Sequence, residues 1–166
     1  MSASGSAEAP AANSSARPSE RLAELGLALP PVVPPVAAYV PAVRTGDLVF
    51  TSGQLPMTGG ELGAMGKVGA QVTAERAKEL ARLCALNALA AVDVLVGLDH
   101  VVRVVKVVGF VASTAEFTGQ PGVVNGASEL LAEVFGEASQ HARSAVGVAA
   151  LPLDAPVEVE LVVEVS

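Results

Sequence analysis

Aromatic residues and cysteine are scarce in this chain of 166 residues. It contains no tryptophan, one tyrosine, four phenylalanines and a single cysteine, Cys84. A single cysteine excludes an intramolecular disulfide and a cysteine-based zinc site, and it fits a reducing, cytoplasmic location. Because apolar residues still make up 51% of the sequence, we expect a core of small side chains, chiefly alanine and valine.

Positive charge and long apolar runs are also limited. The 10 lysines and arginines face 17 acids, for a net charge of −7, which disfavours nucleic acid and anionic membranes as partners. Arg103 and Lys106 interrupt the most hydrophobic segment, so we expect no membrane span, and the N-terminus lacks the features of a signal peptide. His100 and His141 form no metal motif, and no metal or other cofactor is expected.

The length predicts one folded domain behind a leader. Residues 1–18 are rich in serine, alanine, glycine and proline and are expected to be disordered, whereas residues 19–166 form a single domain. A short helix is predicted at residues 19–27 with Ser19 as its cap, followed by an extended proline-rich connector.

Hydrophobic periodicity predicts the remaining elements in the order β-β-α-β-α-β-β. The strands are expected at residues 38–43, 48–52, 100–112, 144–150 and 157–165, and the helices at 73–96 and 123–135. This order indicates an α+β fold with both long helices on one face of a mixed sheet. The strand at 101–111 is apolar on both faces, so a partner subunit is the simplest cover for the second face.

The C-terminal region carries the chemistry. Acids alternate with apolar residues in the last strand, which places Glu158, Glu160 and Glu164 on one face. Arg143 precedes a short apolar strand, and we interpret an arginine and a carboxylate on adjacent strands as a clamp for a small polar substrate. The alternatives are a surface arginine paired with a nearby acid and a solvated strand face.

Several short motifs occur together in a specific order. They are Ala38-Tyr39-Val40, Thr51-Ser52-Gly53-Gln54-Leu55-Pro56, Val107-Val108-Gly109-Phe110-Val111 with Phe117, Val124-Asn125, Ala142-Arg143-Ser144, Leu151-Pro152 and Val157-Glu158-Val159-Glu160. Over residues 34–165 this set resembles the Rid family of YjgF-type proteins, also called the L-PSP or reactive-intermediate deaminase family.

The resemblance implies a homotrimer with a chorismate-mutase-like α+β fold and clefts between subunits. It also implies hydrolysis of reactive enamines and imines, such as 2-aminoacrylate and 2-iminobutanoate, to 2-keto acids and ammonia. The alternatives are a non-catalytic trimer that binds small carboxylate metabolites or a partner protein, and an endoribonuclease, which the acidic charge disfavours.

The resemblance also implies roles for individual residues. Arg143 matches the arginine that holds the substrate carboxylate, and Glu158 matches the carboxylate that positions water. Many members have cysteine and glutamate where this chain has Ala145 and Gly147, and residues 118–122 form an apparent insertion. These departures mark a divergent branch.

Four further residues match the substrate-binding cleft of the family. Tyr39 corresponds to a tyrosine that lines it, Ser52 and Gly53 to a loop beside it, and Asn125 to a cleft asparagine. Each has an ordinary alternative: a tyrosine at a sheet edge, turn chemistry for the Ser-Gly pair, and a helix cap for Asn125.

Overall fold

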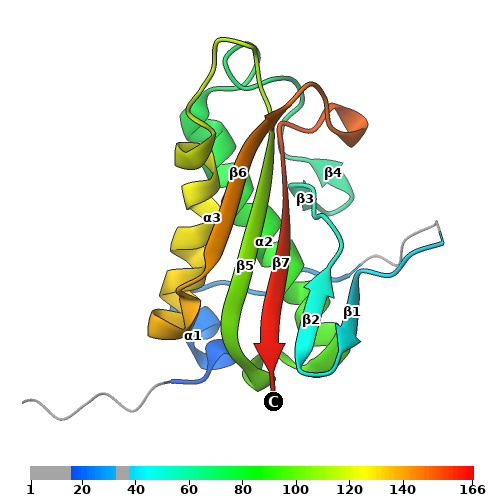
Figure 1. Cartoon of the computed structure of the whole chain (residues 1–166), viewed down its shortest axis with the longest axis vertical. Coiled ribbons are helices and arrows are strands. Elements are labelled where there is room, and N and C mark those ends of the chain that lie inside the picture. The colour runs from blue at the N-terminus through cyan, green and yellow to red at the C-terminus, as the bar shows by residue number, and fades with distance from the viewer. Residues whose placement is uncertain (1–15, 33–37) are drawn as a thin grey trace, which may run out of the picture.

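The computed structural model describes residues 16–32 and 38–166 (Figure 1). Most of the expected leader and part of the proline-rich connector therefore lie outside the described residues. The helices and strands are, in chain order, α1 Pro18–Glu24, β1 Ala42–Thr45, β2 Leu48–Thr51, β3 Met57–Thr58, β4 Glu61–Leu62, α2 Ala74–Val96, β5 Val101–Ala112, α3 Gln120–Phe135, β6 Ala142–Val148 and β7 Val157–Val165, with 3₁₀ turns at Leu98–His100, Gly136–Ser139 and Pro152–Asp154.

The main sheet has five strands in the order β1-β2-β7-β5-β6. Neighbouring strands in this sheet are antiparallel, except that β5 and β6 run parallel. The parallel pair is possible because α3 returns the chain to the other end of the sheet between these two strands. A small hairpin of β3 and β4 lies beside this sheet (Figure 1). The predicted α+β class with a mixed sheet is confirmed.

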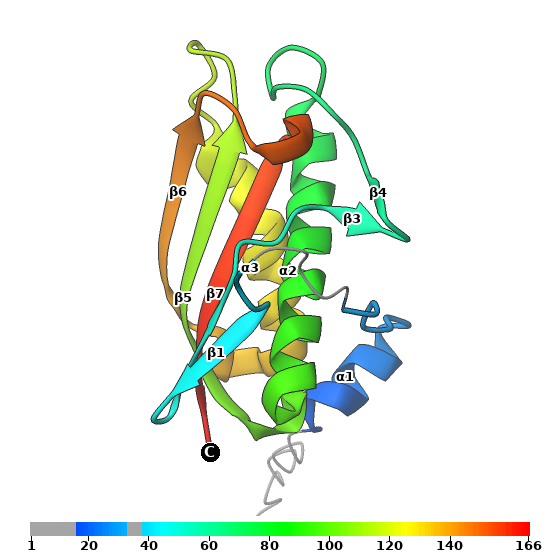
Figure 2. The same cartoon turned by 90° about the vertical axis from the view of Figure 1, so that its right-hand side faces the viewer.

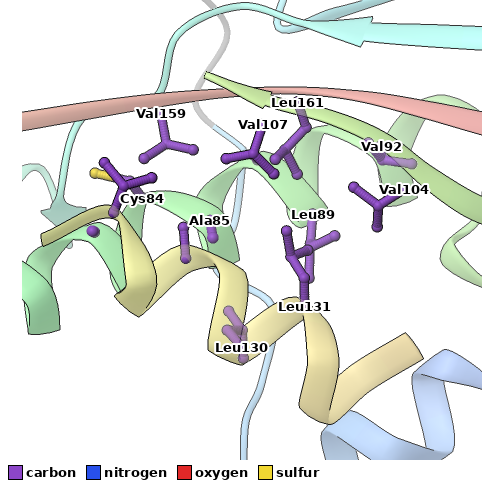
Figure 3. Close-up of a cluster of buried hydrophobic side chains, with 14 of the residues drawn as sticks. Cys84, Ala85, Leu89, Val92, Val104, Val107, Leu130, Leu131, Val159 and Leu161 are labelled. Carbon is purple, nitrogen blue, oxygen red and sulfur yellow. The ribbon is translucent and has the colours of Figure 1, made fainter. Parts of the chain in front are cut away.

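Both long helices cover one face of the sheet, as predicted (Figure 2). Helix α2 begins after Thr73, whose hydroxyl accepts from the backbone N–H of Arg76 at 3.2 Å, and it ends at Gly97, where φ is +85°. Both ends agree with the prediction. Figure 3 shows how Val159 and Leu161 of β7 and Val107 of β5 point toward the leucines and alanines of the two helices.

The two helices approach closely at Gly126 of α3. A Cβ atom at this position would lie only 1.9 Å from the carbonyl oxygen of Lys78 on α2, so only glycine fits. This contact fixes the rotation of α3, and it therefore fixes where the flanking residues Asn125 and Ser128 point.

The opposite face of the sheet, here called the open face, carries exposed apolar side chains. Val43, Phe50 and Val146 are 52%, 39% and 44% exposed. The glutamates of β7 share this face, because its burial alternates along the strand with Val157, Val159 and Leu161 buried under the helices. The alternation predicted for the last strand is confirmed.

Several predicted boundaries are wrong. The first strand begins at Ala42 rather than at residue 38, and α3 begins at Gln120, three residues before the predicted start. Helix α1 starts at Pro18 after the cap residue Arg17, so Ser19 is not the cap. The Ser19 hydroxyl instead donates to Asp99 Oδ2 at 2.7 Å. The first helical position is Pro18, and proline is favoured at this position.

No helix within residues 16–32 and 38–166 is long and apolar enough to cross a membrane.

Candidate functional site

Arg143 lies near the start of β6, the edge strand of the sheet, and its guanidinium is held by α3. Nη1 donates to Asn125 Oδ1 at 2.8 Å and to Ser128 Oγ at 3.2 Å, and Nη2 donates to the carbonyl oxygen of Pro121 at 3.3 Å. These contacts use three of the five N–H donors of an arginine. The two that remain, on Nε and Nη2, form the planar fork that binds a carboxylate with two parallel hydrogen bonds.

No acid among the described residues neutralises the charge of Arg143. Across the part of the chain that the structure describes, seven ion pairs form, and none of them involves Arg143. The predicted alternative of a surface arginine paired with an acid is therefore not what the structure contains. A partly buried, immobilised cation with a free fork is a suitable site for an organic anion.

Asn125 is one of the predicted binding residues, and its place in α3 tests the alternative interpretation as a helix cap. It lies in the second turn of α3, whose cap position is Gly119. The alternative of a helix cap is therefore wrong, and its side-chain oxygen accepts from Arg143 instead.

Two neighbours of Arg143 were not predicted to belong to the site. The hydroxyl of Ser128 lies 3.0 Å from His141 Nε2 as well as 3.2 Å from Arg143. We call Arg143, Asn125, Ser128 and His141 the arginine group. Two sequence signals point to the additions: His141 precedes Arg143 by two residues, which gives a shared face on an extended chain, and Ser128 follows Asn125 by three on a helix.

Glu158 lies on β7 and its carboxylate rests against Gly53. A Cβ atom at Gly53 would be 1.9 Å from Glu158 Oε1, so the glycine makes room for the carboxylate. Burial raises the pKa of Glu158, and the neighbouring charge of Glu160 raises that pKa further. A carboxyl group with a raised pKa is suited to take and return a proton near neutral pH.

Ser52 and Tyr39 are the other residues expected beside Glu158, and Ser52 directly precedes Gly53 in the chain. The Ser52 hydroxyl donates to the carbonyl oxygen of Val40 at 2.6 Å, which ties the segment after Tyr39 to the end of β2. Tyr39 itself is 60% exposed. We call Glu158, Gly53, Ser52 and Tyr39 the glutamate group.

The structure separates the two groups within one chain. Strand β5 lies between β6 and β7, so the expectation that Arg143 and Glu158 occupy adjacent strands is wrong. Arg143 is aligned with Val107, which faces the helices (Figure 3). Glu158 is aligned with Phe110 and lies on the open face, because burial alternates along β7. One chain therefore cannot bring both side chains to one small molecule.

The two departures from the family motif lie beyond Arg143 on β6. Ala145 packs against the core. Gly147 lies beneath Gln120, because a Cβ there would be 2.8 Å from Gln120 Nε2 and 3.0 Å from Ser113 Oγ. The Gln120 amide is itself held by the carbonyl oxygen of Phe117 at 2.7 Å. Gln120 of α3 therefore lies over Gly147, where a side chain on β6 would otherwise be.

Other parts of the molecule offer less. A shallow groove of about 290 Å³ lies between α2 and α3, but its cations are paired, Lys78 with Glu129 and Arg82 with Glu133. Among the described residues, no group of three or more histidines, cysteines or acids is placed to hold a metal ion.

Known proteins resemble this chain over most of its length, and solved structures among them share its fold. The family model described as Endoribonuclease L-PSP matches residues 31–165. Protein TCP17 of Trypanosoma cruzi is 43% identical over 154 residues, which are 92% of this chain and 96% of that protein.

Two solved structures extend this comparison. The protein Atu1372 of Agrobacterium tumefaciens, of unknown function, is 45% identical with a TM-score of 0.81, over 89% of this chain and 91% of its own. E. coli TdcF, solved with bound serine, is 28% identical with a TM-score of 0.60, over 80% and 92% of the two chains. On the family model and these relatives together, this chain belongs to the endoribonuclease L-PSP family, the family of the YjgF-type proteins whose motifs it carries.

Proposed function

We propose that this protein hydrolyses small enamines and imines derived from amino acids to 2-keto acids and ammonia. The observation that carries the proposal is the guanidinium of Arg143, held at three points by α3 and unpaired with any acid of the described residues. Its free fork would take the carboxylate that every 2-imino acid retains. The bound serine of TdcF, which also carries a carboxylate, supports this ligand class.

The raised pKa of Glu158 supports the chemical step. Water attacks the imine carbon while Glu158 takes its proton and passes it to the imine nitrogen, which gives a neutral tetrahedral carbinolamine. Glu158 then takes the proton of the new hydroxyl group and delivers it to the amine, the C–N bond breaks as the carbonyl forms, and ammonia leaves with the 2-keto acid. Atoms and charge balance without a metal, a thiol or a redox partner, so Ala145 in place of cysteine does not block this route.

We further propose that the site is completed between copies of the chain. The two groups lie on opposite faces of the sheet, so Arg143 of one copy would meet Glu158 of the next in a cyclic homotrimer. Exposed apolar residues on the open face, among them Phe50 and Val146, support this arrangement because association would bury them. Tyr39, Ser52 and Gly53 would then line the cleft beside Glu158.

The test uses an amino-acid oxidase that generates 2-iminopropanoate from alanine in the presence of semicarbazide. Hydrolysis by the added protein competes with trapping, so the rate of semicarbazone formation falls as protein is added. Arg143→Ala should abolish this effect, whereas Arg103→Ala, which removes an exposed arginine from β5, should retain it.

Two other results would replace the proposal. Binding of pyruvate to Arg143 without any effect on trapping would identify a non-catalytic carboxylate-binding protein. Cleavage of RNA that disappears in Arg143→Ala would identify a ribonuclease instead.

A further inference from the structure

The Ser128 hydroxyl forms a bridge between Arg143 and His141. Nδ1 of His141 is hydrogen-bonded to the carbonyl oxygen of Ser139, which can only accept, so Nδ1 carries the proton. In the neutral ring Nε2 is then an acceptor, and the Ser128 hydroxyl donates to it over 3.0 Å. The lone pairs of Ser128 Oγ remain for Arg143 Nη1 at 3.2 Å. The three hydrogen bonds therefore form a chain: Arg143 donates to Ser128, Ser128 donates to His141, and His141 donates to Ser139.

The bridge explains why Ser128 faces β6. A serine inside a helix commonly donates to the carbonyl four residues earlier, which turns its hydroxyl along the helix. In the described part of the chain the partners of Ser128 Oγ are instead Arg143 and His141. His141 therefore draws the hydroxyl across to the sheet, where its oxygen supports the guanidinium.

We propose that Ser128 and His141 are positioning residues for Arg143, and that His141 acts through its Nε2 acceptor. The pair holds the guanidinium so that the Nε and Nη2 fork stays presented to a carboxylate. This inference rests on the proposed role of Arg143 as the carboxylate-binding residue. Neither Ser128 nor His141 would contact the substrate.

A matched pair of substitutions tests the Nε2 contact. The side-chain oxygen of glutamine occupies the place of Nε2, so His141→Gln keeps an acceptor for Ser128. The amide of asparagine occupies the place of Nδ1, so His141→Asn keeps the contact to Ser139 and loses the one to Ser128. Ser128→Ala removes the bridge itself. All three are compared in the full-length protein.

We expect Ser128→Ala and His141→Asn to raise the Kd for pyruvate by roughly five-fold, the effect of about one lost hydrogen bond. In the trapping assay they should raise KM by a similar factor and leave kcat within about two-fold, since the carboxylate contact is made in the ground state as well. His141→Gln should stay close to the wild type. Equal Kd values for all variants would overturn the proposal, and so would equal losses for glutamine and asparagine.

A second measurement is independent of ligand and turnover. In ¹⁵N-labelled protein, His141 should show a protonated Nδ1 and an unprotonated Nε2 when neutral, with His100 as the other histidine for reference. The Nη1–H resonances of Arg143, which belong to the group that donates to Ser128, should lose protection from solvent exchange in Ser128→Ala. The opposite tautomer, or unchanged exchange, would refute the bridge. If instead the bridge is present and pyruvate does not bind, the proposed function fails while the positioning of Arg143 stands.

Discussion

The arginine group and the glutamate group differ in how far one chain completes them. Arg143 receives three acceptors from α3, and its remaining donors form a ready fork. Glu158 has no hydrogen-bond donor among the described residues. Its burial and the neighbouring charge of Glu160 both disfavour the charged carboxylate. Within the described residues, one chain therefore holds a guanidinium with donors to spare on one face of its sheet and a carboxylate without a hydrogen-bond donor on the other. The comparison supports the proposal that Glu158 works with groups from outside its own chain.

The largest expected effect comes from removing the guanidinium of Arg143. Arg143→Ala should lower kcat/KM for 2-iminopropanoate by roughly 100- to 1,000-fold, because a desolvated guanidinium–carboxylate pair is lost. Initial rates of semicarbazone trapping measure this change. Arg103→Ala removes a charge from the adjacent strand β5 and should stay within about two-fold of the wild type. Comparable losses in both variants would mean that net charge matters and the fork does not.

The second prediction tests whether the two groups meet across copies. Glu158→Gln and Arg143→Ala should each be nearly inactive alone. Refolded together in equal amounts, they should regain about a quarter of the wild-type activity, since half of the copies supply an intact arginine and half of their neighbours an intact glutamate. No recovery in mixtures shown by mass spectrometry to contain both variants would contradict a shared site.

The third prediction concerns the room that Gly53 leaves for Glu158. Gly53→Ala places a methyl group 1.9 Å from the present position of Glu158 Oε1 and must displace the carboxylate. We expect kcat to fall by about ten-fold with the Kd for pyruvate nearly unchanged, because misplacing a general base affects the chemical step.

Gly122→Ala is the matched control for this substitution. Gly122 lies in the first turn of α3, and a Cβ added there meets no neighbouring group within 4 Å. The Gly122→Ala variant should therefore retain its activity. A Gly53→Ala variant with a wild-type kcat would show that the carboxylate does not work from this position.

The elements that were predicted correctly are those whose signals are local. Helix α2 is predicted by its cap residue Thr73, by its apolar face and by Gly97 at its end. The last strand is predicted by the alternation of acids and apolar residues. The predicted start of α3 is three residues late because residues 118–122 were interpreted as an insertion, although proline is tolerated in the first turn of a helix.

The candidate site was predicted in its residues but not in its arrangement. Periodicity shows that Glu158 and Val159 face opposite ways, but it carries no information on which strand inserts between β6 and β7. That order depends on pairing between distant segments, and it decides that Arg143 and Glu158 do not meet in one chain. The Ser128–His141 contact likewise joins a helix and a strand that only tertiary packing brings together.

The smallest expected effect concerns stability and pH. The pKa of Glu158 is raised from its ordinary value of 4.5, so the folded protein holds this proton more tightly than the unfolded chain. As pH rises from about 4.5 through the raised pKa, this group therefore lowers the free energy of unfolding. Glu133 has the opposite sign, because its hydrogen bond with Arg82 lowers its pKa, and the stability it contributes is lost as pH falls.

Glu158→Gln isolates the first of these contributions, since Glu133 is the same in both proteins. At pH 7 the variant should be more stable than the wild type, and the difference should vanish near pH 4. Urea unfolding at fixed protein concentration and ionic strength measures both values. Glu164→Gln removes the same charge from the same face of β7 and controls for net charge. Parallel pH profiles for the wild type and Glu158→Gln would mean that the carboxylate is solvated in the folded protein. The contrast between an arginine held by its own chain and a glutamate without a hydrogen-bond donor would then be lost.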